Sequence, residues 1–385
     1  MEFIDLNAQQ KVLGKKIDDC LARVLRHGKY IMGPEVQDLE RNLASFCGAD
    51  YAISCANGTD ALQLACMALN LGVGDAVMVP SFSFAATAEG PCLVGATPIF
   101  VDCDPLTFNM DPESLLRSLD QSKKLGLRAK AVISVDLFGI PANYPEILKI
   151  TEAYSLQLIC DSAQGWGSSI EGQMTGTFGT ITTTSFFPSK PLGCYGDGGA
   201  LFTQDYDLSE KLKSLRAHGK GSQKYDNIRV GINSRLDTLQ AAILLEKLAL
   251  YSGEIEGRNQ VAARYTKALK RTIQTPTVPV GYQSIWAQYT VRANNFRHRA
   301  DCMAALKADS IPSMIYYPTP LHMQSAYKDF PQDPNGLPNS ERIADQVFSL
   351  PMHPYLAVEE QQKVINSLQK FCKHSIFDKF NQTIT

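Results

Sequence analysis

Residues 185–199 read Ser-Phe-Phe-Pro-Ser-Lys-Pro-Leu-Gly-Cys-Tyr-Gly-Asp-Gly-Gly, and they join a strand-like run of threonines and aromatic residues to a glycine-rich turn. Lys190 lies at the turning point. A lysine beside two phenylalanines commonly lies at the surface and covers apolar area with its stem. The alternative is that its amine is a covalent anchor for a bound ligand. The groups that the rest of the chain can bring to this amine distinguish the two interpretations.

A strand-end carboxylate is the first such group. The apolar run Leu156–Cys160 predicts a buried strand. Asp161 comes at its carboxyl end, where open α/β sheets bind their ligands. An acid in this place can pair with a pyridinium nitrogen and keep it protonated, although an aspartate after a strand also caps turns. Gln164, three residues further on, either hydrogen-bonds a ring oxygen of the same ligand or lies on the surface.

A site for an anion is the second. Residues 56–60 read Ala-Asn-Gly-Thr-Asp and come immediately before Ala61–Leu69, which has the composition of a helix. Backbone N–H groups at a helix start bind anions, and Gly58 lets the chain approach the ligand closely. Thr59 can add a hydroxyl group. The same residues also begin many helices that bind nothing, since Asn-Gly turns and Thr or Asp caps are common.

An aromatic residue is the third. Phe84 follows the end of the apolar run that closes at Val79. Its ring can stack on a flat heteroaromatic ring, which gains about 0.5 to 1.5 kcal/mol beyond the burial of area. Packing in the hydrophobic core is the commoner role of such a phenylalanine.

The order of these groups along the chain, together with Ser185 and Lys190 in the form Ser-x-x-x-x-Lys, resembles the pyridoxal phosphate (PLP) enzymes of fold type I. Within them the chain is similar to the DegT/DnrJ-type sugar-nucleotide aminotransferases, from about Phe3 to Leu368. Further segments that carry the resemblance are Gly33–Val36, Phe84–Ala88, Arg216–Gly219, Gly231–Asp237 and Tyr317–His322.

The resemblance implies PLP as the cofactor and a role for each of its contacts. The catalytic pair is Lys190, which holds PLP, and Asp161, which pairs with the ring nitrogen. The remaining cofactor contacts are Gln164 at the ring oxygen, Phe84 over the ring, Gly58, Thr59 and Ser185 at the phosphate, and Asn233 at the phosphate from a neighbouring subunit. The last contact requires a homodimer.

Three residues are implied at the substrate. Arg235 is expected at its charged groups, and Tyr317 and His322 are expected near the sugar nucleotide. An arginine near a helix start is otherwise a solvated charge, and a histidine in a loop often makes only structural hydrogen bonds.

As a base, the amine of Lys190 must be neutral, so its pKa, ordinarily about 10.4, must be lowered by burial or by positive charge.

Four segments are similar to the branch that aminates UDP-2-acetamido-2-deoxy-3-oxo-D-glucuronate, with L-glutamate as amino donor, in bacterial O-antigen and other surface-polysaccharide synthesis. They are Ile53–Asp60, Ser185–Gly199, Asn233–Leu244 and Ser349–Tyr355. Relatives that act on dTDP-linked 3-keto-6-deoxyhexoses share the Asn233–Asp237 part, and 4-keto sugars are a further alternative. Two other classes are a sugar dehydratase on the same fold, which would lack the lysine, and a non-catalytic regulatory protein.

The chain also departs from the family pattern. Cys160 stands where relatives often have an acid, Ser162 stands where alanine is usual, and Asp136 stands where histidine is common. None of these departures removes a catalytic group, so they bear on substrate details more than on the chemistry.

The composition is that of an ordinary globular protein, with 385 residues of which 44% are hydrophobic and 20% are charged. The net charge of -2 gives no reason to expect nucleic acid or an anionic membrane as a partner. The 10 cysteines include no Cys-x-x-Cys pair, so we expect neither a metal site nor a disulfide framework. No leader peptide and no long apolar run is visible, and the cytoplasm is the expected location.

Apolar runs alternate with helix-like stretches, which predicts an α/β fold with a mostly parallel central sheet and helices on both faces. We expect a large PLP-binding domain over residues 1–250, ending with a helix over Leu236–Leu250, and a smaller α+β domain over residues 251–385. The tail 373–385 has no pattern. The predicted strands of the large domain are Ala76–Val79, Pro98–Val101, Ala131–Val135, Leu156–Cys160, Ile181–Phe186 and Ala200–Phe202.

Overall fold

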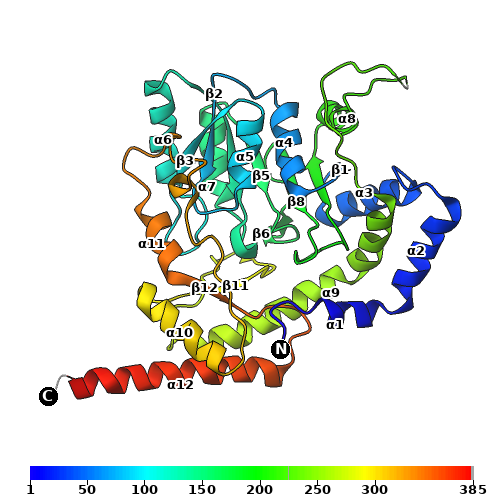
Figure 1. Cartoon of the computed structure of the whole chain (residues 1–385). Helices are drawn as coiled ribbons and strands as arrows, with labels where there is room; N and C mark the ends of the chain where they lie inside the picture. The colour runs from blue at the N-terminus through cyan, green and yellow to red at the C-terminus, as the bar shows by residue number, and fades with distance from the viewer. Residues whose placement is uncertain (224, 383–385) are drawn as a thin grey trace.

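The computed structural model describes residues 1–223 and 225–382, and a seven-stranded sheet forms its centre (Figure 1). The strand order is β1-β9-β8-β5-β4-β2-β3, and β9 runs antiparallel to both of its neighbours while the other pairs are parallel. The mostly parallel sheet is therefore confirmed. Its strands are β1 (Tyr51–Cys55), β2 (Asp75–Pro80), β3 (Thr97–Val101), β4 (Arg128–Val135), β5 (Gln157–Asp161), β8 (Ile181–Ser185) and β9 (Gly199–Thr203).

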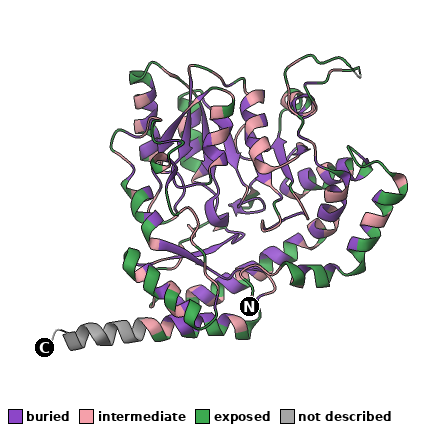
Figure 2. Cartoon of the chain, viewed as in Figure 1, coloured by how far each residue is buried: buried purple, intermediate pink, exposed green. Residues whose placement is uncertain are grey.

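Helices cover both faces of this sheet, so the strands are buried over most of their length (Figure 2). In β2, for example, Val77 and Val79 point to one hydrophobic cluster while Ala76 and Met78 point to another. Because side chains alternate along a strand, a strand covered on both sides is apolar at every position. One face packs against α4 (Gly58–Ala68), α5 (Ala86–Leu93) and α8 (Tyr206–Leu215), and the other against α3 (Pro34–Cys47), α6 (Pro112–Lys124), α7 (Tyr144–Ala153) and α9 (Thr238–Leu269).

The long helix α9 differs from its prediction, because it continues 19 residues beyond Leu250 and has 32 residues in all. Its first half packs in the core beside the sheet, and its second half, through Val261 and Tyr265, packs in a separate cluster. Gly253 and Gly257 make the sequence pattern look interrupted. The predicted division after residue 250 remains a prediction, and it lies inside this helix.

The second cluster belongs to the carboxy-terminal part of the chain. There the two-stranded antiparallel sheet of β11 (Tyr289–Arg292) and β12 (Val347–Leu350) packs with α10 (Phe296–Ala308) and α12 (Val358–Gln382). The patternless stretch from Lys373 is helical as far as Gln382, and residues 383–385 lie outside the described residues. The remaining elements are α1 (Leu6–Leu13), α2 (Lys15–His27), α11 (Pro338–Gln346), β6 (Ser169–Ile170), β7 (Gln173–Met174), β10 (Tyr282–Gln283) and the short 3-10 helices Leu137–Gly139 and Leu321–Met323.

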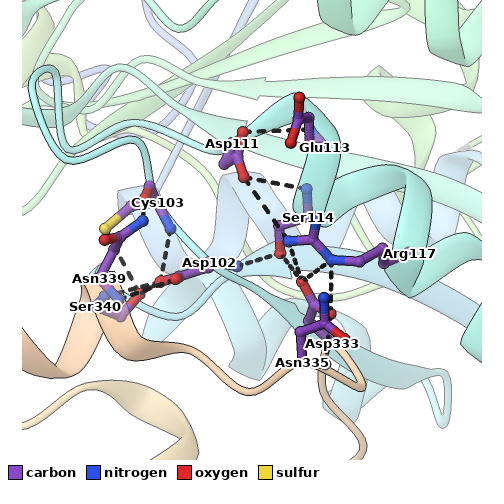
Figure 3. Close-up of polar contacts among 10 residues, drawn as sticks. All are labelled: Asp102, Cys103, Asp111, Glu113, Ser114, Arg117, Asp333, Asn335, Asn339 and Ser340. Atoms are coloured by element: carbon purple, nitrogen blue, oxygen red, sulfur yellow. Dashed lines mark hydrogen bonds and ion pairs between the residues drawn. The ribbon is translucent and has the colours of Figure 1, made fainter.

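Two buried carboxylates fasten this second part to the sheet domain (Figure 3). Asp333, whose side chain is 0% exposed, pairs with Arg117 of α6 at 2.8 Å and accepts a hydrogen bond from Ser114 at 2.6 Å. Asp102, directly after β3, accepts hydrogen bonds from the backbone N–H and the hydroxyl of Ser340, both at 2.7 Å, in the first turn of α11. Residues 333–340 are thereby held against α6 and the end of β3, close to the segment that carries the predicted substrate residues.

Candidate active site

The ends of neighbouring strands bring the predicted cofactor residues to one edge of the sheet. Asp161 is the last residue of β5 and Ser185 is the last residue of β8, and the two strands are parallel neighbours. Gly58 and Thr59 begin α4, which follows β1. Because the carboxyl ends of parallel strands meet at the same edge, residues more than a hundred positions apart in sequence lie together there.

Asp161 and Lys190 form the electrostatic centre of this edge. The Asp161 carboxylate is buried and accepts hydrogen bonds from the N–H of Ala163 at 3.1 Å and the hydroxyl of Thr87 at 3.4 Å. Burial raises the pKa of Asp161, while the charge of Lys190 opposes this rise. Burial also lowers the pKa of Lys190, against the attraction of Asp161. A lowered pKa favours the neutral amine, which is the form that a nucleophile or base requires.

Gly58 and Ser185 make a narrow cradle at the start of α4. A Cβ atom on Gly58 would lie 2.7 Å from the Cβ atom of Ser185, so only glycine fits there without a shift. Asn57 caps the helix by accepting a hydrogen bond from the N–H of Asp60 at 2.8 Å. Within the described residues, the N–H groups of Gly58 and Thr59 make no hydrogen bond, and Gly58 lies beside the Ser185 hydroxyl. These features fit the phosphate of PLP.

We expect Gly58→Ala to weaken the binding of PLP by about tenfold or more, which corresponds to about 1.4 kcal/mol. The added methyl group would push Ser185 away from the helix start. The measurement is a titration of the apoprotein with PLP, followed by absorbance. Gly253→Ala is the matched control, because this helical glycine has nothing within 4 Å of an added Cβ atom. An unchanged dissociation constant for Gly58→Ala would contradict the cradle.

Gln164 connects the cofactor edge to the carboxy-terminal part of the chain. Its side-chain oxygen accepts a hydrogen bond from the N–H of Phe138 at 2.7 Å, and its NH₂ group donates to the hydroxyl of Tyr317 at 2.5 Å. Gln164 is buried, so the surface alternative does not apply. The structure thus brings together Tyr317, predicted at the substrate, and Gln164, predicted at the cofactor.

The ring of His322 is held on both sides. Its Nδ1 atom lies 2.6 Å from the hydroxyl oxygen of Ser81, just after β2, and its Nε2 atom lies 3.3 Å from a carboxylate oxygen of Glu341 in α11. Both nitrogens are therefore occupied. This arrangement favours a structural role for His322, in which it fixes the loop that also carries Tyr317, over direct contact with the substrate.

Three predicted residues are accessible. Phe84 is 59% exposed, so the core alternative for it does not apply. Asn233 is exposed, and a backbone bridge to Ala217 holds it. Arg235 is half-buried, and within residues 1–223 and 225–382 its guanidinium makes no ion pair. These side chains are open to a ligand or to a second subunit.

A buried carboxylate next to Asp161 was not predicted as part of the site. Asp136 accepts hydrogen bonds from the hydroxyl of Ser162, from the hydroxyl of Tyr144 at 2.7 Å and from the N–H of Ala142 at 2.9 Å. Burial raises the pKa of Asp136 to about 6. Asp136 and Ser162 are two of the departures from the family pattern, and here they contact each other. The departures were visible in the sequence, but their coupling required the structure.

We expect Asp136→Asn to stabilise the apoprotein at pH 8. The pKa of Asp136 rises from its ordinary 3.8 to about 6 on folding, which corresponds to about 3 kcal/mol. This stability is present in the parent below pH 3.8 and is lost as the pH rises through about 6. The difference between variant and parent should therefore grow from pH 4 to pH 8 in urea unfolding. The exposed Asp120→Asn is the control, and a gap that is independent of pH would contradict the assignment.

Within the described residues, no helix is long and apolar enough to cross a bilayer. In the same residues, no group of three or more His, Cys, Asp or Glu side chains is placed to hold a metal ion.

Known proteins are similar to the chain over nearly its whole length. The sequence model of the DegT/DnrJ/EryC1/StrS aminotransferase family matches residues 11–369. The UDP-2-acetamido-2-deoxy-3-oxo-D-glucuronate aminotransferase of Pseudomonas aeruginosa is 49% identical over 357 residues, which are 92% of this chain and 96% of that protein.

Solved structures agree. A DegT DnrJ EryC1 StrS aminotransferase from Brucella abortus is 49% identical and superposes with a TM-score of 0.94, covering 96% of this chain and 99% of its own. NtdA from Bacillus subtilis, with bound cofactor PMP, is 30% identical with a TM-score of 0.86, covering 96% of this chain and 83% of its own. The predicted type I fold of PLP enzymes is thereby confirmed.

Proposed function

Because the chain belongs to the DegT/DnrJ/EryC1/StrS aminotransferase family, we propose that it transfers the amino group of L-glutamate to a nucleotide-linked 3-keto sugar. UDP-2-acetamido-2-deoxy-3-oxo-D-glucuronate is the proposed substrate, since the relative from Pseudomonas aeruginosa carries that name and is 49% identical. The chain is an aminotransferase, and its cofactor is PLP. The observation that carries the proposal is the coupling of Lys190 to Asp161 beside the cradle of Gly58 and Ser185.

Each residue has a defined task in this chemistry. PLP supplies an electron sink for the carbon atom that loses or gains a proton. Lys190 would hold the cofactor through its Nζ atom, and its amine, when free, would move the proton at the donor's α-carbon. Asp161 keeps a proton on the ring nitrogen. Gly58, Thr59 and Ser185 bind the phosphate.

The remaining cofactor residues orient and shield the ring. Gln164, fixed between Phe138 and Tyr317, orients the ring oxygen. Phe84, whose side chain is exposed, would cover one face of the ring and exclude water from it. A partner subunit would bring its own Asn233 to the phosphate, so the working unit is a homodimer. Sedimentation that shows an active monomer at low concentration would refute this.

The proposed substrate carries a carboxylate and a diphosphate, and the unpaired Arg235 is the candidate contact for these charges. Tyr317 lies near the sugar, and His322 holds the same loop. The proposed setting is the cytoplasm, where nucleotide sugars for bacterial surface polysaccharides such as O-antigen are built. A lysine at position 190 disfavours the dehydratase alternative.

A panel of sugars tests the substrate. The purified enzyme with PLP and L-glutamate is given UDP-2-acetamido-2-deoxy-3-oxo-D-glucuronate, a dTDP-linked 3-keto-6-deoxyhexose and a nucleotide-linked 4-keto sugar. Mass spectrometry of the products should show an amino sugar only, or at least about tenfold faster, with the first. Faster conversion of either alternative would replace the proposed substrate and leave the reaction class intact.

A further inference from the structure

We propose that Lys247 of α9 is a positioning residue that holds the turn bearing Lys190 in its working shape. This inference rests on the proposed role of Lys190 as the anchor of PLP. Lys247 is 1% exposed, and its Nζ atom donates a hydrogen bond to the carbonyl oxygen of Gly193 at 2.5 Å. The same Nζ atom lies 4.4 Å above the ring of Tyr195. Both contacts are in the turn that joins β8 to β9.

A buried ammonium group in this place requires an explanation. Within residues 1–223 and 225–382, Lys247 has no ion pair within 4.0 Å, and burial lowers its pKa to about 8, opposed by the charge of Glu254. A buried cation without a close anion lowers stability, and an apolar side chain of similar length would fill the same space without that cost. We therefore infer that Lys247 is a lysine because its amine hydrogen-bonds the carbonyl oxygen of Gly193.

Contacts lead in two steps from Gly193 to the anchor. A Cβ atom on Gly193 would lie 2.5 Å from the carbonyl oxygen of Pro188 and 2.7 Å from that of Phe187, so the turn folds tightly onto itself at this point. The N–H of Lys190 donates to the carbonyl oxygen of Phe187 at 2.8 Å. A contact that fixes Gly193 therefore also fixes the backbone that orients Lys190.

A second contact from the same helix supports this role. Gln240 accepts a hydrogen bond from the N–H of Tyr195 at 2.9 Å. Gln240 and Lys247 are seven residues apart, which is about two helical turns, so both side chains leave one face of α9. The helix α9 therefore makes hydrogen bonds to the turn at both Gly193 and Tyr195. Since α9 also packs in the carboxy-terminal core, the turn is tied to an element that both parts of the chain share.

The test compares Lys247→Met with the parent by two readouts that need no sugar substrate. In the apoprotein, amide hydrogen exchange of residues 186–198 should be about tenfold faster, while the unfolding temperature stays equal or rises because a buried charge is gone. After addition of PLP, the covalent attachment to Lys190, followed by absorbance, should be about tenfold slower. Lys149→Met, at an exposed lysine, is the control.

Unchanged exchange in the turn together with unchanged attachment would overturn the inference. Should the methionine variant fail to fold, Lys247→Gln decides by the same readouts, because it removes the charge but keeps a donor that is too short to hold Gly193 in the same way. An incorrect substrate would leave both readouts intact. An incorrect role for Lys190 would appear as a lack of covalent attachment in the parent itself.

Discussion

Lys190→Ala abolishes amino transfer, with a loss of at least about a thousandfold, since it removes both the covalent anchor and the base that moves the proton. We expect the fold to be retained. Burial lowers the pKa of Lys190, so burying its charge lowers stability. Within residues 1–223 and 225–382, the amine makes no hydrogen bond that its removal would break. The measurement is the rate of conversion of glutamate to 2-oxoglutarate in the presence of the keto sugar.

A second measurement accompanies the rate. Mass spectrometry after reduction with borohydride should show PLP attached to the parent and to the control Lys213→Ala, but not to Lys190→Ala. Lys213 is a suitable control because it is paired to Glu210 on the surface of α8. A variant that kept most of its turnover, or that still attached PLP at another lysine, would show that Lys190 is not the anchor.

Asp161→Asn is expected to lower the rate by about a hundredfold or more, since an amide does not keep the ring nitrogen protonated. The variant should still fold, because burial already raises the pKa of this carboxyl and so disfavours its charge. The pH profile supplies a second readout. Asp161 raises the pKa of Lys190, so its removal should shift to lower pH the limb at which the lysine becomes neutral.

The control for this variant is Asp136→Asn, which makes the same chemical change one hydrogen-bonded step away, at the partner of Ser162. It should leave the limb at which Lys190 becomes neutral near that of the parent. Equal rate losses in both variants would show that the charge of the whole pocket, rather than a contact of Asp161 with the ring, governs the reaction.

Local patterns in the sequence were sufficient for the sheet and for much of the candidate site. Strands such as β2 and β5 are continuous apolar runs, because helices bury both of their faces. A residue directly after such a run lies at the ligand edge of the sheet, which is why the sequence predicts Asp161 there, whereas Ser185 was predicted from its resemblance to the family pattern Ser-x-x-x-x-Lys. Gly58 was recognisable because a glycine before a helical run marks close approach.

Other contacts depend on how distant segments pack. The bond from Lys247 to Gly193 spans 54 residues, that from Ser162 to Asp136 spans 26, and that from His322 to Ser81 spans 241. In the sequence, Lys247 reads as a polar position on an amphipathic helix, and only the packed structure places it in the interior. The hydrophobic periodicity of a helix or strand shows which of its faces is apolar. It does not show which other segment packs against that face.

From sequence alone, the chain specified its α/β class and the strand ends that carry the candidate reactive groups, because these follow from hydrophobic periodicity and from short motifs. The residues proposed to contact PLP were predicted from the family resemblance. Only the tertiary structure showed the full length of α9, the hydrogen bond between Ser162 and Asp136 beside Asp161, and the contact of Lys247 with the turn that carries Lys190. Those features arise where buried polar groups must find partners, and the partners come from segments that only the closed core brings together.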